Sequence, residues 1–274
     1  MTARSIRTFL KIVILFLYVL WTIVPILLVI SNSFKTQMEI FSVPPTILFA
    51  PTLDNYARAI SSGDFGRYFW NSFCVGAISS LLSVGLGSLA AYSLVYLQPK
   101  YASLIADLFL LGKLVPAITM LLPLFALLNL TGLLGTYFGP VLAHTSVNLP
   151  FVVWLIMGFL REVPKDLESA ATMDGCTPMQ TFWLIITPVI APGLAAAGIL
   201  SLQYSWNELL FSLQLTNIDT YTLPVGISKF VGSISVDWGK SSAAASLTMI
   251  PMILFGFVVQ KYLAKGTIGG AVKG

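Results

Sequence analysis

The feature that most constrains this chain is a series of long apolar stretches separated by few charged residues. Only 9% of its 274 residues are Asp, Glu, Lys or Arg, whereas 57% are hydrophobic. Soluble globular proteins carry roughly 25% charged residues, which cover their surface in water. So few charges predict an integral membrane protein, and they exclude a soluble enzyme and a free nucleic-acid-binding domain. The formal net charge of +4 is also too small to indicate a polyanionic partner.

The apolar stretches predict an all-α fold with six transmembrane helices, because a helix needs about 20 apolar residues to cross a bilayer. We expect one transmembrane domain over residues 1–274. The first stretch follows a basic segment but is long for a signal peptide and lacks a small-residue cleavage site, so we interpret it as a retained span. Pro116 and Pro123 can kink the third span, and Pro251 can kink the sixth. The predicted spans are about 12–30, 72–97, 104–130, 140–160, 190–213 and 243–263.

The orientation follows from the Lys and Arg residues outside the spans or at their ends, because cytoplasmic loops carry an excess of both. If the N-terminus is cytoplasmic, nine of these residues fall inside and five outside, with Lys113 left out because it lies within a span. Both termini are therefore predicted to be cytoplasmic. The cytoplasmic set is Arg4, Arg7, Lys11, Lys100, Arg161, Lys165, Lys261, Lys265 and Lys273, and the outer set is Lys35, Arg58, Arg67, Lys229 and Lys240.

Small residues predict which spans pack closely, because they let helix backbones approach each other in lipid. The second span carries such residues at four-residue spacing, on one face: Ser79, Ser83, Gly87 and Ala91. The fifth span carries the run Ala195–Gly198. This pattern fits any bundle of membrane helices and does not indicate a function by itself.

The cytoplasmic loop over about 161–188 is polar and rich in small residues. Pro164 suits a helix start, and acidic residues follow in the first turn, where they favour the helix dipole. Gly175 can end this helix in a left-handed cap, and Thr177-Pro178 can start a second one. A slim helix–turn–helix of this kind suits insertion into a groove of a partner, although it could also lie on the membrane interface.

This segment resembles the EAA loop of the membrane subunits of bacterial ABC import systems, the binding-protein-dependent import family. Its pattern is roughly Glu-Ala-Ala, three residues and Gly, with Ile-x-Leu-Pro further on. Ala170, Ala171, Asp174 and Gly175 match it, whereas Ser169 replaces the motif Glu and Glu168 precedes it. The downstream element Ile185–Pro188 matches loosely, with Thr187 where Leu is usual.

Within that family the chain is similar to the carbohydrate-uptake branch, as the second permease of a maltose-type pair. The similarity lies in Leu167-Glu168 and Met173–Pro178, in Trp206–Leu210 and in Gly269–Gly274 of the tail 264–274, which ends Gly-Ala-Val-Lys-Gly. It implies the type I importer permease fold, with cytoplasmic coupling helices between spans four and five, in a bacterial cytoplasmic membrane. The implied ATPase-coupling residues are Glu168, Ser169, Ala170, Ala171, Asp174, Gly175, Thr177 and Lys273.

The same resemblance implies the partners. They are a second permease of six or more spans, two ABC ATPase subunits, an extracytoplasmic sugar-binding protein and a sugar substrate, with no nucleic acid. The permease binds no cofactor, because ATP and Mg²⁺ are used by the partner ATPases. The identity of the sugar is not readable from the sequence.

Polar residues within the spans are candidates for the substrate path, because charges in a bilayer are costly and often functional. Lys113 and Glu208 are explained either by a pair between them or by a water-lined cavity, and His144 is expected to be a packed or interfacial residue rather than a ligand. The alternative for each polar residue is a helix cross-link or a place in the outer vestibule. The path candidates are Lys113, Asn148, Gln203, Tyr204, Trp206, Asn207 and Glu208.

Three rival functions are weaker. A membrane enzyme would need a catalytic constellation, and neither His-Glu-x-x-His nor Gly-x-Ser-x-Gly occurs. An ATPase would need a phosphate-binding loop, but Ile234 stands where the first Gly of that motif should precede Gly239-Lys240-Ser241. A secondary transporter or channel stays open as the alternative, although no repeat between the two halves supports it. Cys74 and Cys176 do not suggest a disulfide or a metal site.

Overall fold

The computed structural model of the chain describes residues 3–61, 64–230 and 237–270, with side chains over 7–61, 64–230 and 237–262. These residues form helices and connecting loops and contain no β-strand. The chain divides into two compact units. The first comprises Met1–Gly66 and Gly226–Ile250, and the second comprises Arg67–Val225 and Pro251–Gly274.

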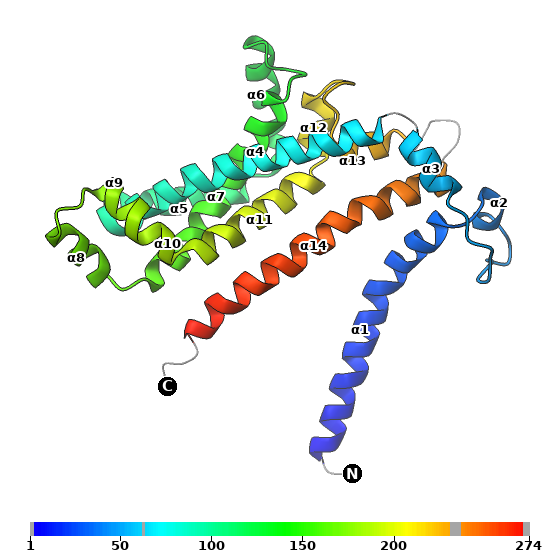
Figure 1. Cartoon of the computed structure of the whole chain (residues 1–274), viewed down its shortest axis with the longest axis horizontal. Helices are drawn as coiled ribbons and strands as arrows, with labels where there is room; N and C mark the ends of the chain where they lie inside the picture. The colour runs from blue at the N-terminus through cyan, green and yellow to red at the C-terminus, as the bar shows by residue number, and fades with distance from the viewer. Residues whose placement is uncertain (1–2, 62–63, 231–236, 271–274) are drawn as a thin grey trace. The chain divides into compact units, whose positions relative to one another are not determined.

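The first unit contains α1 (Ala3–Ser33), α2 (Gln37–Ile40), α3 (Asp54–Ser61) and the beginning of α14 (Trp238–Gly270) (Figure 1). The apolar side chains of α1 are exposed almost all round, as expected of a helix that faces lipid. Asn55 is buried, and its Nδ2 donates to the carbonyl oxygens of Ser33 and Lys35 at 2.9 and 2.7 Å. Arg58 forms an ion pair with Asp237, so α3 is tied to both ends of this unit.

The second unit carries the remaining helices, and two of its elements extend past the unit boundaries. They are α4 (Phe65–Tyr92), the π-helix η1 (Ser93–Leu97), α5 (Ala102–Leu114), α6 (Ala117–Leu130), α7 (Phe138–Glu162), α8 (Asp166–Met173), α9 (Pro178–Gln180), the π-helix η2 (Thr181–Ile186), α10 (Thr187–Val189), α11 (Ala191–Asn207), α12 (Leu210–Leu215) and α13 (Leu223–Ser228).

Small residues bring α4 close to α7 and α11. The predicted stripe of Ser79, Ser83, Gly87 and Ala91 is buried along α4, which confirms that this face packs inside the bundle. A Cβ atom placed on Gly87 would lie 2.7 Å from Cγ1 of Val152 in α7. The Ser80 hydroxyl donates to the carbonyl oxygen of Gly198 in α11 at 2.7 Å, which adds a hydrogen bond between α4 and α11.

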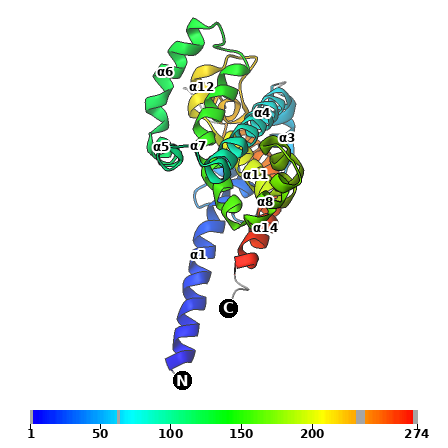
Figure 2. The same ribbon diagram turned by 90° about the vertical axis from the view of Figure 1, so that its left-hand side faces the viewer.

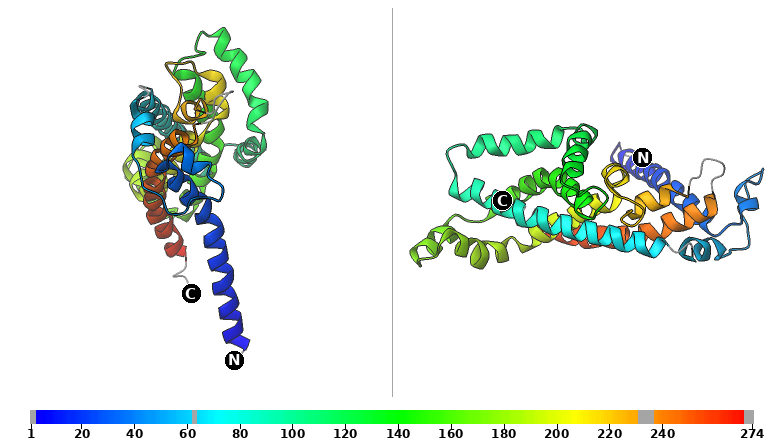
Figure 3. Two further views of the ribbon diagram at one scale, coloured as in Figure 1. Left: turned by 90° about the vertical axis from the view of Figure 1, so that its right-hand side faces the viewer. Right: turned by 90° about the horizontal axis from the view of Figure 1, so that it is seen from above.

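An apolar core fills the region where α4, α7 and η2 meet. Tyr92, Ile156, Leu160, Phe182 and Ile186 are all buried in it. The rings of Tyr92 and Phe182 lie 5.2 Å apart between centroids. The segment that follows α8 is therefore anchored on the long helices, and the right-hand view of Figure 3 shows α8 and α9 at one end of this unit.

Four described helices are long and apolar enough to span a membrane, and two bent helix pairs add two more if each pair counts as one span. The four are Arg7–Ser33, Phe65–Leu97, Phe138–Glu162 and Trp238–Tyr262. These helices extend past the predicted spans. The helix that contains the second predicted span begins seven residues before residue 72, at Phe65, and runs through the polar residues Arg67 and Asn71.

The third predicted span, 104–130, is broken. Helices α5 and α6 meet at an angle of 97°, so that α6 runs across the direction of α5 in Figure 2. Val115 adopts an extended conformation before Pro116, as a residue that precedes proline favours. Two prolines were expected to allow a kink in this span, and the break lies at Pro116 and is sharper than a kink. Pro123 lies inside α6.

The fifth predicted span, 190–213, is also not continuous. Helix α11 ends at Asn207, Glu208 is extended, and α12 begins at Leu210. At the other end, the segment Pro178–Val189 meets α11 at 81°. No Gly or Pro lies between Ser205 and Ser212 to explain the break at Glu208, so its cause must come from contacts outside this segment.

The close approach of α4 to α7 yields a stability prediction. We expect Gly87→Val to lower the free energy of unfolding by about 1–3 kcal/mol, because the added side chain overlaps Val152. Gly85→Val is the matched control, because a Cβ atom there meets nothing within 4 Å on the same helix. The thermal midpoint of the detergent-solubilised protein measures the effect, and equal midpoints for the two variants would contradict close packing at Gly87.

Candidate functional site

The 161–188 loop has the helix–turn–helix structure that its residues predict. Helix α8 ends at Met173, and Gly175, two residues further on, has a left-handed φ of +83°. The Cys176 amide donates to the Ala171 carbonyl at 3.0 Å, and the Gly175 amide donates to the Thr172 carbonyl at 3.1 Å, which together form a Schellman cap.

The second helix of the loop starts with a reciprocal cap. The Thr177 amide donates to Oε1 of Gln180 at 2.8 Å, and the Gln180 amide donates to the Thr177 hydroxyl at 3.4 Å. Pro178 occupies the first helical position. Only Gly175 and Cys176 lie between the C-cap residue Asp174 and the N-cap residue Thr177. Hydrogen bonds within the loop therefore determine the conformation of this short turn.

The tip of this loop is exposed and slim, while its base is buried. Ser169, Ala170, Asp174, Gly175 and Thr177 are exposed, and Glu168 is half-buried. Ala171 points inward, at 1% exposure, and Met173 at the tip is 83% exposed. The structure thus groups the predicted coupling residues on one projecting turn, except Lys273, which lies outside the described residues.

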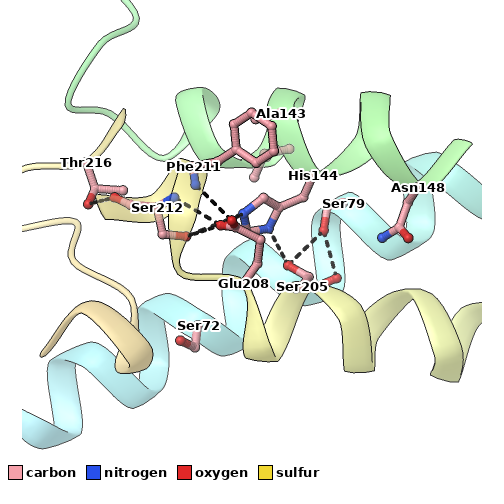
Figure 4. A network of polar contacts seen from close by, with 12 residues as sticks. Ser72, Ser79, Ala143, His144, Asn148, Ser205, Glu208, Phe211, Ser212 and Thr216 are labelled. Carbon is pink, nitrogen blue, oxygen red and sulfur yellow. Dashed lines mark hydrogen bonds and ion pairs between the residues drawn. The ribbon is translucent and has the colours of Figure 1, made fainter. Parts of the chain in front are cut away.

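A second cluster of polar residues lies where α11 breaks (Figure 4). Nε2 of His144, in α7, is 2.9 Å from Oε2 of Glu208. Oε1 of Glu208 accepts from the Phe211 amide at 2.8 Å, and Oε2 accepts from the Ser212 amide at 3.0 Å. His144 is fully buried and Glu208 is 8% exposed, so the pair is closed to solvent.

The donors around Glu208 define how this cluster is protonated. The Ser212 hydroxyl adds a further donor to Oε2 at 3.1 Å. A carboxyl group that accepts from three protein donors and faces an imidazole is bound as the carboxylate, which leaves the Nε2 proton of His144 to point at it. Nδ1 of His144 then lies 2.5 Å from the Ser205 hydroxyl, which lies 3.3 Å from the Ser79 hydroxyl of α4.

This cluster corrects the partner predicted for Lys113. Glu208 pairs with His144, and no ion pair joins Lys113 to Glu208 among the residues that the structure describes. The Lys113 ammonium lies 5.6 Å from the ring centroids of Phe151 and of Tyr204. The interaction of Lys113 within the chain is therefore cation–π, and its side chain remains exposed.

The other predicted path residues divide by accessibility. Nδ2 of Asn148 donates to the Ser201 carbonyl at 3.2 Å, so Asn148 cross-links α7 and α11. Trp206 is 1% exposed and packs against aromatic rings of α4 and α14, which removes it as a stacking surface. Gln203 and Tyr204 are partly exposed and Asn207 is exposed, so these three can still contact a solute.

The contact between His144 and Glu208 was not expected from the sequence. The full burial of His144 agrees with the expectation of a packed residue, but its partner was not predicted. The available signal was that a His and a Glu both lay within predicted spans, where ionisable groups pair with one another.

Both cysteines are free, and the described residues contain no cluster of three His, Cys, Asp or Glu side chains that could hold a metal ion.

Comparison with known proteins decides the family. Residues 83–269 match the family model described as "Binding-protein-dependent transport system inner membrane component". The chain belongs to this family. The match contains the whole 161–188 loop and the His144–Glu208 pair, and it identifies a permease subunit of an ABC importer rather than an enzyme.

Two relatives are similar over nearly the whole permease. The trehalose transport system permease protein SugB of Mycobacterium tuberculosis is 37% identical, with 93% of each chain covered. The trehalose/maltose transport system permease protein MalG of Thermococcus litoralis is 32% identical, covering 85% of this chain and 88% of the relative. Both relatives are named as sugar permeases.

The fold is shared with a solved structure. A chain of a bacterial ABC transporter involved in the import of the acidic polysaccharide alginate has a TM-score of 0.74 and 21% identity to this permease. The similarity covers 96% of this chain and 99% of the other. The all-helical permease fold is therefore confirmed.

The corrected position of Lys113 yields a prediction. Lys113→Met should lower transport several-fold, because it removes the cation that bridges rings of α7 and α11, contacts worth about 0.5–2 kcal/mol each. Lys113→Arg should retain most transport, because guanidinium also binds aromatic faces. Uptake per inserted permease is the measurement. Wild-type uptake by Lys113→Met would mean that the ammonium only extends toward the membrane surface.

Proposed function

We propose that this permease is one of two membrane subunits of an ATP-driven sugar importer, and that its 161–188 loop transmits the movement of a partner ATPase. The observation that carries this proposal is the projecting turn at Gly175, capped on both sides. Such a rigid, slim projection fits a groove on a partner, whereas its buried base transmits force to α4 and α7.

The coupling follows from this geometry. Closure of two ATPase subunits on ATP would move the loops of two permeases, and each loop would pull on the long helices into which its base packs. Phe182 and Ile186 are fully buried against α4 and α7, so displacement of α8 and η2 displaces those helices. The path between the permeases would then switch its accessible side. ATP and Mg²⁺ belong to the ATPases in this scheme.

The membrane arrangement completes the proposal. We infer six spans, counting each bent pair as one, with both termini cytoplasmic and all residues 1–274 in one transmembrane domain. The distribution of Lys and Arg supports this orientation, and it places the 161–188 loop on the side of the ATPases. A second, different permease forms the other half of the path, and an extracytoplasmic binding protein delivers the substrate. The family match does not favour a carrier or channel without an ATPase.

The sugar class is supported by the relatives and by the accessible side chains of α11. Gln203, Tyr204 and Asn207 offer amide groups and an aromatic ring, which are the groups that bind sugar hydroxyls and sugar faces. The test is ATP-dependent uptake by the complete transporter in proteoliposomes, with its binding protein and a panel of sugars. Stimulation by at least one sugar supports the class, and uptake of non-sugar solutes alone would contradict it.

The role of the loop is tested by Gly175→Val. A β-branched residue in the left-handed region costs about 1–3 kcal/mol, so the turn between α8 and α9 should change conformation. We expect the variant to insert in the membrane but to lose uptake and to release the ATPase during purification.

Gly132→Val is the matched control. Gly132 also has a left-handed φ, of +70°, and a Cβ atom at either glycine meets nothing within 4 Å. Both variants therefore impose the same backbone strain, but Gly132 lies in the loop between α6 and α7. Retention of the ATPase by Gly175→Val, or its equal loss in both variants, would contradict a specific docking role.

A further inference from the structure

The break between α11 and α12 lacks a cause in its own sequence. Helix α11 ends at Asn207 and α12 starts at Leu210, although the segment between Ser205 and Ser212 contains no Gly or Pro. Sharp interruptions of helices usually have an identifiable local cause, such as proline or an inserted side chain. Here Glu208 supplies the cause, because its carboxylate takes the place of backbone carbonyl partners.

The carboxylate satisfies the amide groups that the break releases. In a continuous helix the Phe211 and Ser212 amides would donate to the carbonyls of Asn207 and Glu208. At the break they donate instead to the two carboxylate oxygens of Glu208, at 2.8 and 3.0 Å. Phe211 and Ser212 are buried, and unpaired amides away from water are costly, so the break persists only while the carboxylate stays in place.

The carboxylate in turn needs a cationic or proton-donating partner. It is 8% exposed, and a buried charge without a partner strongly destabilises a fold. His144 supplies the partner from α7, and the Ser205 and Ser79 hydroxyls hold the other side of its ring. Figure 4 shows that this chain of contacts runs from α12 through α7 and α11 to α4.

We propose that the His144–Glu208 pair clamps the helix break at Glu208, so that both are positioning residues that set where α12 stands against α7 during transport. Helix α12 also packs through Phe211 and Leu215 against Leu128 of α6 and Ala143 of α7. The Gly135 amide donates to the Leu215 carbonyl at 2.9 Å. The His144–Glu208 pair thus holds the beginning of α12, while the contacts of Phe211 and Leu215 hold the rest of this short helix.

The break at Glu208 lies next to the accessible polar residues of α11. The break directly follows the turn of α11 that carries Gln203, Tyr204 and Asn207, the accessible polar residues. Hinges are element ends that absorb changes in backbone angles, and Glu208 is such an end. The proposal rests on the transport role of the family and not on the sugar class, so failure of the sugar assignment leaves it intact.

The first experiment measures the break in the intact transporter by spin-label distances. Ala191→Cys and Leu213→Cys place labels on exposed positions of α11 and α12, in a Cys74→Ser, Cys176→Ser background. A continuous helix would separate these positions by about 33 Å, at about 1.5 Å per residue. We expect a shorter distance in the parent and a shift toward the longer distance in Glu208→Leu. An unchanged distribution in Glu208→Leu would overturn the proposal.

The second experiment separates positioning from general stability. His144→Leu should lower uptake by about tenfold or more, the change expected when a conformational equilibrium loses its bias, while ATP hydrolysis falls much less. More ATP is then hydrolysed per substrate imported, which a merely unstable subunit would not cause. His144→Gln retains an N–H donor toward Glu208 and should restore part of the uptake.

Asn148→Leu is the matched control for His144→Leu. Asn148 lies one turn further along α7 and also cross-links α7 to α11, but at Ser201, within the continuous part of the helix. We expect it to leave the ratio of ATP hydrolysed to substrate imported close to that of the parent. Equal ratios in His144→Leu, Asn148→Leu and the parent would overturn the proposal, as would equal uncoupling by both variants.

Discussion

The close approach of α4, α7 and α11 is the constraint on which the other features depend. Hydrophobic attraction does not drive helices together in lipid, so association relies on small residues and on hydrogen bonds between helices. Gly76 and Gly87 leave no room for a Cβ atom against Leu202 and Val152. The Ser79, Ser80 and Asn148 contacts add hydrogen bonds across the same interfaces. The loop base and the buried pair are both built on this packed group.

The turn at Gly175 and the helix break at Glu208 both adjoin the packed helices α4, α7 and α11. Hydrogen bonds of backbone amides, and not packing alone, stabilise each of them. At Gly175 the amides close a Schellman cap, which makes the exposed turn rigid without bulky side chains. At Glu208 they bind a carboxylate, which makes a helix end where the sequence contains no helix breaker. In an import permease we propose that the first transfers force from an ATPase and that the second positions α12.

The sequence predicted local features better than distant ones. The ends of α8 and α9 could be read from Gly175 and Thr177, because a cap depends on residues within one turn. Pro116 and Pro123 were both possible sites of a kink in the third span, but only Pro116 marks the break, and the angle there depends on the packing of α5 and α6. The break at Glu208 could not be predicted, because its partner His144 lies 64 residues away. The expected pair of Lys113 with Glu208 was wrong for a similar reason. Opposite charges in two spans do not show which side chains meet in the folded chain.

The measurement that tests the central claim most directly is purification of the tagged permease from its native membrane in a mild detergent, followed by identification of the proteins that accompany it. An import permease with the proposed partners should retain two copies of an ABC ATPase and one different permease, and the complex should hydrolyse ATP. Recovery of the chain alone, or as a homodimer with no ATPase, would contradict the account.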